Sequence, residues 1–209
     1  MIFESNPEAS KITMRGGIGD FENHISADDF ITVLGEHSGD IEIELDSPGG
    51  SVTDGLAIYN AIRNYDGKVT IHIDTLAASI ATVVACAADR VKINSNGKFM
   101  VHRAWTVAMG NCKEFRSMAD LMELMDGDIA DVYAYRTGKD KDELLAMMDK
   151  ETWLSAEDAA EIGFVDEVVQ VNSKEKPKAE AKPVVKAICP AIQIAAAETG
   201  RRLRVKYGI

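Results

Sequence analysis

The chain has 209 residues, 46% of them apolar and 27% charged, so it can bury the core of one α/β domain and is not a disordered chain. A formal net charge of −11 repels phosphate backbones and anionic lipids, so we expect neither nucleic acid nor a membrane as partner. The three cysteines have neither metal-ligand spacing nor the number for a disulfide framework, and no signal peptide or long apolar run is recognisable. A cytoplasmic protein is therefore expected.

Residues 40–46, DIEIELD, alternate apolar and acidic side chains, which is typical of a strand with one buried face. The turn SPGG follows, and apolar residues at helical spacing then predict a helix over residues 51–65. A second alternating strand is predicted over residues 68–74. Strand, helix and strand together form a βαβ unit.

Residues 76–88, LAASIATVVACAA, are small or apolar, which predicts a helix packed on all sides. The remaining predicted elements are strands near 90–94 and 98–102, a helix from about 113 to 137, helices near 141–149 and from 155 to 162, and a strand at 164–171. This alternation predicts an α/β fold. Methionines and leucines in the long helix are most simply core packing, with an oligomer interface as the alternative: Met118, Leu121, Met122, Leu124 and Met125.

The main domain is expected to span residues 1–171. Residues 172–187 are rich in Lys, Glu, Ala and Pro, a composition that cannot bury a core and indicates a charged linker. Residues 188–209 form a C-terminal tail with the pattern of a short helix, a basic end and no chemical motif.

Ser79 is the one strongly polar group in the apolar run of residues 76–88. Small neighbours would let a substrate backbone approach it, and the start of a helix favours developing negative charge. Taken alone, a serine that caps the helix is the simpler interpretation.

His102 ends the strand predicted near residues 98–102, a place where catalytic groups are often found. A structural histidine is the alternative. The other histidines are weaker candidates, because His24 and His37 are expected in a loop or on a helix surface and His72 lies on the polar phase of its strand.

Gly49 and Gly50 can present backbone N–H groups to an anionic oxygen at the mouth of the next helix, although they also suit a tight turn. The run from Gly50 to Thr53 could pair with an extended peptide as an added strand. We therefore expect Gly49, Ser51, Val52 and Thr53 to bind substrate.

Four blocks resemble, in order and with similar separations, the signature blocks of the ClpP family of serine peptidases. They are DSPGGSVTDGLAIYNAIR, TLAASIATVVACAADR, KFMVHRAW and ETWLSAEDAAEIGFVDEV, within residues 40–170. Within this family, the short sequences AWT and ETW most resemble those of the phage-type ClpP-like head-maturation proteases. The resemblance implies a ClpP/crotonase-like spiral of β-β-α units with a projecting handle helix. It also implies Ser79 as nucleophile of an acyl-enzyme, His102 as general base, and the amides of Gly50 and Ile80 as oxyanion donors.

The third triad position departs from the family pattern. Members carry an aspartate two residues before the aromatic of the last block, and here Glu151 precedes Trp153. Glutamate can also orient an imidazole, so Glu151 is the predicted acid, with Asp149 as competitor.

The resemblance implies polypeptide substrates, either unfolded or phage structural proteins, a homo-oligomeric ring, and no cofactor or metal. An ATP-dependent unfoldase partner is in doubt, because the start of the chain has no recognisable counterpart to the family's axial loops. Two other functions stay open: a crotonase-type acyl-CoA enzyme on the same fold, and a catalytically inactive ring or scaffold subunit. The serine, histidine and acid set favours a peptidase over both.

Overall fold

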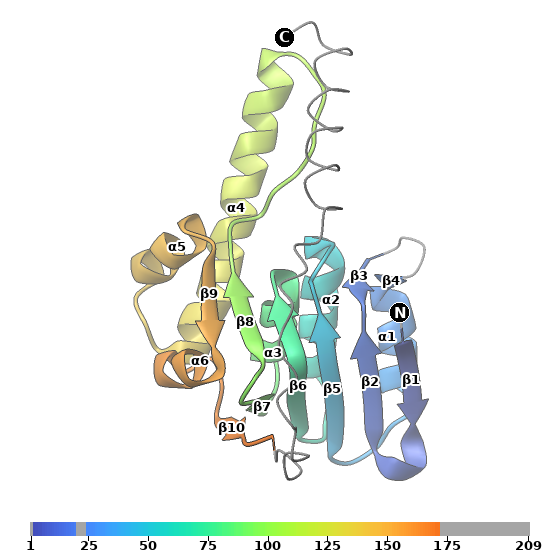
Figure 1. Cartoon of the computed structure of the whole chain (residues 1–209). Coiled ribbons are helices and arrows are strands. Elements are labelled where there is room, and N and C mark those ends of the chain that lie inside the picture. The colour runs from blue at the N-terminus through green and yellow to red at the C-terminus, as the bar shows by residue number, and fades with distance from the viewer. Residues whose placement is uncertain (1, 20–23, 172–209) are drawn as a thin grey trace, which may run out of the picture. The chain divides into compact units, whose positions relative to one another are not determined.

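A computed structural model describes residues 2–19 and 24–171, which form a mixed α/β fold (Figure 1). The main path of its large sheet runs in the order β1 (Ile2–Asn6), β2 (Lys11–Arg15), β5 (Ile41–Ser47), β6 (Val69–Ala78), β7 (Arg90–Asn94) and β10 (Glu167–Val169). Along this path only β1 and β2 pair antiparallel. The α/β fold class predicted from the sequence is confirmed.

The sheet forks at β6, which is long enough to pair with two strands in succession. Its first part, Thr70–Ile73, pairs with β7, and its last part, Leu76–Ala78, pairs with β8 (Lys98–Val101). Strand β9 (Thr152–Ser155) then adds to β8 in the antiparallel direction. Because β6 and β8 are parallel neighbours, the residues that follow them meet at one edge of the sheet.

The helices are α1 (Ala27–Leu34), α2 (Val52–Arg63), α3 (Ile80–Cys86), α4 (Cys112–Thr137), α5 (Lys141–Asp149) and α6 (Ala156–Ile162), and a 3₁₀ turn covers Pro7–Ala9. Every residue of α3 is buried, as its composition predicts. Helix α2 packs on α3 at a glycine, because a Cβ on Gly55 would lie 2.2 Å from Cγ1 of Ile80. Because β6 ends at Ala78 and α3 begins at Ile80, the α2–α3 pair lies close to the end of β6.

Helix α4 is buried along only part of its length. Its buried residues lie in the C-terminal half, whereas the N-terminal half extends beyond the sheet as a projecting handle (Figure 1). An Asn111–Glu114 capping box begins the helix, and Gly138 ends it in the left-handed conformation at φ 70°. The predicted end of this helix at Gly138 is confirmed.

A small parallel pair, β3 (Gly17–Ile18) and β4 (His24–Ile25), lies next to the large sheet. Ile18 accepts a hydrogen bond from the N–H of Ser51 at 2.8 Å, and its own N–H donates to Gly49 at 2.9 Å. This contact links the N-terminal region to the SPGG turn.

The structure corrects several predicted boundaries. Residues 76–78, predicted as helix, continue β6, because their backbone groups pair with β8 and the helix begins only at Ile80. The last strand covers Glu167–Val169 rather than the whole of 164–171, and β9 was not predicted. Among the described residues no helix is long and apolar enough to cross a membrane. The predicted linker 172–187 and tail 188–209 lie outside the described residues.

Candidate active site

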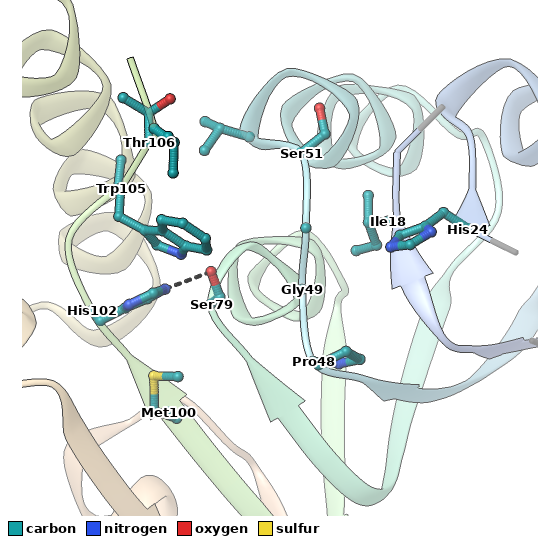
Figure 2. A pocket seen from close by; sticks show the side chains of 14 residues that line it. Ile18, His24, Pro48, Gly49, Ser51, Ser79, Met100, His102, Trp105 and Thr106 are labelled. Atoms are coloured by element: carbon teal, nitrogen blue, oxygen red, sulfur yellow. Dashed lines mark hydrogen bonds between the residues drawn. The ribbon is translucent and has the colours of Figure 1, made fainter. Parts of the chain in front are cut away.

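Ser79 and His102 come from the two neighbouring strands at the fork. Ser79 directly follows β6 and His102 directly follows β8, and the N–H of Ser79 donates to the carbonyl of Met100 at 2.9 Å. The Oγ of Ser79 lies 2.7 Å from Nε2 of His102 (Figure 2). This is the geometry that a nucleophile and its general base require.

The backbone of Ser79 explains why its hydroxyl points away from the helix that it precedes. At φ 58° and ψ −132° it lies outside the regions that a residue with a Cβ readily adopts, a conformation that costs about 1–3 kcal/mol. Its side chain makes no hydrogen bond to the N-terminus of α3, so the helix-capping interpretation is wrong. This backbone conformation directs the hydroxyl of Ser79 toward His102.

The SPGG turn lies directly against Ser79. A Cβ on Gly49 would lie 2.6 Å from Cβ of Ser79 and 3.1 Å from the nitrogen of Ile80, and one on Gly50 would lie 2.0 Å from the carbonyl oxygen of Ile18. Both glycines have positive φ, 90° and 149°. Because Ile80 is the first residue of α3, its N–H has no partner within the helix. The turn and the helix start therefore present main chain beside the hydroxyl.

Ser79, His102 and the glycine turn line a cavity of about 640 Å³. Trp105 and His102 lie on one side of Ser79, and Ile18 and His24 lie beyond the glycine turn (Figure 2). The Trp105 side chain is 73% exposed, so this wall is open to solvent. An extended peptide could enter here.

A smaller groove of about 200 Å³ shares Trp105 with this cavity and continues along α4. Its helical wall is apolar: Met118, Leu121, Met122 and Met125. The three methionines are half-buried and Leu121 is exposed, so the interpretation of this set as core packing is wrong. They line a surface groove instead.

The predicted substrate-binding residues have different surroundings. Gly49, Ser51 and Val52 line the large cavity, and Val52 and Thr53 line the groove. The hydroxyl of Ser51 accepts from the N–H of Asp54 at 3.3 Å and donates to its carboxylate at 2.6 Å. Ser51 is thus also the N-cap of α2.

The two candidate acids each bind another side chain. Oε1 of Glu151 accepts from Nε1 of Trp153 at 3.3 Å, and Oδ1 of Asp149 accepts from Nε of Arg103 at 2.7 Å. The hydrogen bond from Arg103 lowers the pKa of Asp149 below its usual value. Within residues 24–171, neither carboxylate is hydrogen-bonded to His102.

The remaining histidines differ in their surroundings. His24 lies on β4 and lines the large cavity, so its expected position in a loop or on a helix surface is wrong. His37 lies in the loop that follows α1, as expected, but it is buried, and its Nε2 lies 3.0 Å from Oγ of Ser5. His72 pairs with Oδ1 of Asn94 at 3.0 Å. Within the described ranges, no His, Cys, Asp and Glu cluster could hold a metal ion.

Sequence reasoning also missed Asp126, a buried carboxylate on α4 that accepts from the N–H of Ala104 at 2.7 Å. Asp126 lies among exposed acidic residues of the same helix, and only the packing of α4 against the segment after His102 distinguishes it. The sequence contains no signal for that packing.

Comparison with known proteins gives a consistent result. A family model described as Clp protease matches residues 8–172. The ATP-dependent Clp protease proteolytic subunit 1 of Leifsonia xyli subsp. xyli is 28% identical over 148 residues, 70% of this chain and 75% of the relative. The ATP-dependent Clp protease proteolytic subunit of Chlorella vulgaris is 32% identical over 135 residues, 64% of this chain and 67% of the relative. Subunit 2 of Tropheryma whipplei is 30% identical over 131 residues, 62% and 73%.

Proposed function

The chain belongs to the Clp protease family of serine peptidases, and we propose that it cleaves peptide bonds through an acyl-enzyme formed at Ser79. The observation that carries this proposal is the 2.7 Å hydrogen bond between Oγ of Ser79 and Nε2 of His102. A serine in a strained conformation, held against a histidine in an open cavity, is arranged for attack rather than for capping.

In the proposed reaction, Nε2 of His102 takes the hydroxyl proton while Oγ of Ser79 attacks the carbonyl carbon of the substrate. The N–H groups of Gly50 and Ile80 donate to the oxyanion of the tetrahedral intermediate. Collapse of the intermediate breaks the C–N bond, and the departing amine receives the proton from His102. Water, activated by the same histidine, then hydrolyses the ester and frees Ser79.

Glu151 is the acid that we propose for orienting His102, with Asp149 as the competitor. Its support is its place in the last sequence block, two residues before Trp153. Glu151 would have to exchange its hydrogen bond with Trp153 for one with His102, while Asp149 would have to leave Arg103. The release of Trp153 is the smaller change, since its bond to Glu151 is long at 3.3 Å, whereas Arg103 and Asp149 form an ion pair at 2.7 Å.

The proposed substrate is an extended polypeptide that lies in the cavity beside Gly49 and Ser51. The expected pairing of a peptide strand along Gly50–Thr53 is wrong, because Val52 and Thr53 begin α2 and the backbone of Ser51 already pairs with Ile18. Cavity and groove both border this segment, and the groove favours an apolar side chain. Unfolded chains or phage structural proteins are proposed as targets, the latter because of the AWT and ETW wording shared with head-maturation proteases. The relatives are named as ATP-dependent Clp protease subunits.

We also propose that the protein works in the cytoplasm as a homo-oligomeric ring. Three large apolar side chains outside the cavity and the groove are exposed on the handle and on the segment that leads to it: Met109, Phe115 and Leu124. Contact between subunits would remove this surface from water. A ring would also enclose the active sites and limit entry to unfolded chains.

Cleavage assays test the proposed activity. Wild-type protein should degrade casein and a candidate capsid or scaffold protein, and Ser79→Ala should degrade neither while keeping its circular dichroism spectrum and melting temperature. The crotonase-type and scaffold alternatives both predict no serine-dependent cleavage. Equal degradation by wild type and Ser79→Ala would remove the peptidase assignment of Ser79.

A further inference from the structure

Asp126 is the one carboxylic acid that is buried among the described residues, with 6% of its surface exposed. It lies on α4 where this helix meets the body of the domain, close to the buried residues Ile129 and Ala130. A carboxylate is costly to bury unless its oxygens receive hydrogen bonds. The hydrogen-bond partners of Asp126 therefore indicate its role.

Both oxygens of Asp126 bind the residues that directly follow His102. Oδ1 accepts from the backbone N–H of Ala104 at 2.7 Å, and Oδ2 accepts from Nη1 of Arg103 at 3.3 Å. Nε of Arg103 in turn donates to Asp149, the last residue of α5, at 2.7 Å. The Arg103 side chain therefore joins this segment to two helices.

The segment after His102 needs such an anchor because regular structure ends there. The ladder between β8 and β9 stops at Val101, and the next helix begins only at Cys112. His102 thus lies at the boundary between a fixed strand and a long irregular connection. The hydrogen bond from the N–H of Ala104 to buried Asp126 fixes the backbone on the C-terminal side of His102, where β8 no longer holds it.

We propose that Asp126 is the positioning residue of His102. It holds the backbone N–H of Ala104 and the side chain of Arg103 against α4, and so keeps Nε2 of His102 in reach of Oγ of Ser79. This inference rests on the proposed function of that pair, but it assigns Asp126 no contact with the substrate. Its role differs from that of Glu151, which would contact the imidazole itself.

The expected effect follows from the sensitivity of catalysis to geometry. A misplacement of about 1 Å can reduce turnover about 10²-fold without changing what binds. Asp126→Ala removes both acceptors, so kcat should fall about 30- to 100-fold while KM stays within about twofold. Asp126→Asn keeps a neutral acceptor for Ala104, and since charge-assisted bonds are roughly twice as strong as neutral ones, we expect a fall of about 3- to 10-fold.

The experiment measures kcat, KM and the rate of labelling by a fluorophosphonate on full-length protein. Asp128→Asn is the matched control, because Asp128 is an exposed acid on the same helix, and it should behave as wild type. Circular dichroism and thermal melting establish that each variant is folded. The labelling rate should fall in parallel with kcat, since both depend on activation of Ser79 by His102.

Several results would overturn the inference. If Asp126→Asn and Asp126→Ala keep wild-type kcat and labelling, Asp126 does not position the base. A rise in KM at constant kcat would instead place Asp126 in substrate binding, and a large shift of the acid limb of the pH–rate profile would make it a direct electrostatic partner of the imidazole. If Asp126→Ala fails to fold, Asp126→Asn alone decides. A wild type that neither cleaves nor labels refutes the proposed function, a different outcome from all of these.

Discussion

The hydroxyl of Ser79 is the group on which the proposed chemistry depends, and two local features determine its direction. The positive φ of Ser79 turns the side chain out of the capping position, and His102 receives it at 2.7 Å. Neither feature is written in the sequence, where a serine before an apolar helix is the pattern of an ordinary cap. The hydrogen bond to His102 distinguishes Ser79 as a candidate nucleophile from a serine that only caps a helix.

The orienting acid can be identified by a mutation series. If Glu151 stabilises the imidazolium, Glu151→Gln should lower kcat by at least about tenfold with little change in KM, whereas Asp149→Asn should have a small effect. Glu151→Asp tests the reach of the side chain and should keep substantial activity if the local backbone adjusts. Steady-state kinetics on a peptide substrate provide the measurement.

The reverse pattern would reassign the role. A large loss in Asp149→Asn beside a nearly silent Glu151→Gln would make Asp149 the acid, and would mean that its ion pair with Arg103 breaks in the working enzyme. If both changes are silent, Ser79 and His102 work as a dyad or use another acid.

The fork in β6 is the element that brings the site together. One strand pairs first with β7 and then with β8, so Ser79 and His102 follow neighbouring parallel strands. Local patterns predicted the strand near 90–94 and the helix from about 113 to 137, which the structure shows as Arg90–Asn94 and Cys112–Thr137. They could not predict the pairing of residues 76–78, because small apolar residues suit a buried helix and a buried strand equally well.

The SPGG turn gives a test at the level of this element. At Gly49 a Cβ would lie 2.6 Å from Cβ of Ser79 and 2.7 Å from the carbonyl oxygen of Ala78, so Gly49→Ala must displace backbone at the active site. We expect it to cost about 2–5 kcal/mol, the sum of left-handed strain and overpacking, and to lower kcat strongly. Urea denaturation and cleavage kinetics measure the two effects.

Gly39 offers a matched control for this substitution. Its φ of 75° carries similar strain for alanine, but a Cβ there would meet no atom within 4 Å. Gly39→Ala should therefore cost only the strain, about 1–2 kcal/mol, and leave kcat unchanged. If the two variants lose the same stability and activity, close packing of the turn against Ser79 is not important.

At the scale of the whole molecule, the distribution of exposed apolar side chains has the clearest consequence. Met109 is 97% exposed and Leu124 is 66% exposed, although both are large and apolar. The sequence indicated a choice between core and interface for the Met-rich helix, and could not decide it, because helical spacing does not show which face meets the body of the domain. The exposure of Leu121 and Leu124 excludes the core, and the interface stays a prediction.

The ring hypothesis predicts that light scattering at micromolar concentration gives a mass several times the 22.7 kDa of one chain. The double variant Met109→Glu, Leu124→Glu should shift the protein toward smaller species, because charge on an apolar contact surface opposes association. Ile31→Glu is the control, since Ile31 is also exposed but lies on α1. A stable wild-type monomer would rule out the ring.

Covalent labelling tests the assignment of Ser79 as the activated nucleophile most directly. Folded wild-type protein treated with a fluorophosphonate should gain one adduct, which mass spectrometry of the digested protein should locate on Ser79. His102→Ala should slow the labelling by orders of magnitude, because the serine then lacks its base at 2.7 Å, and Ser79→Ala should abolish it. Absence of an adduct on the wild type, an adduct on another serine, or labelling that does not depend on His102 would contradict the account.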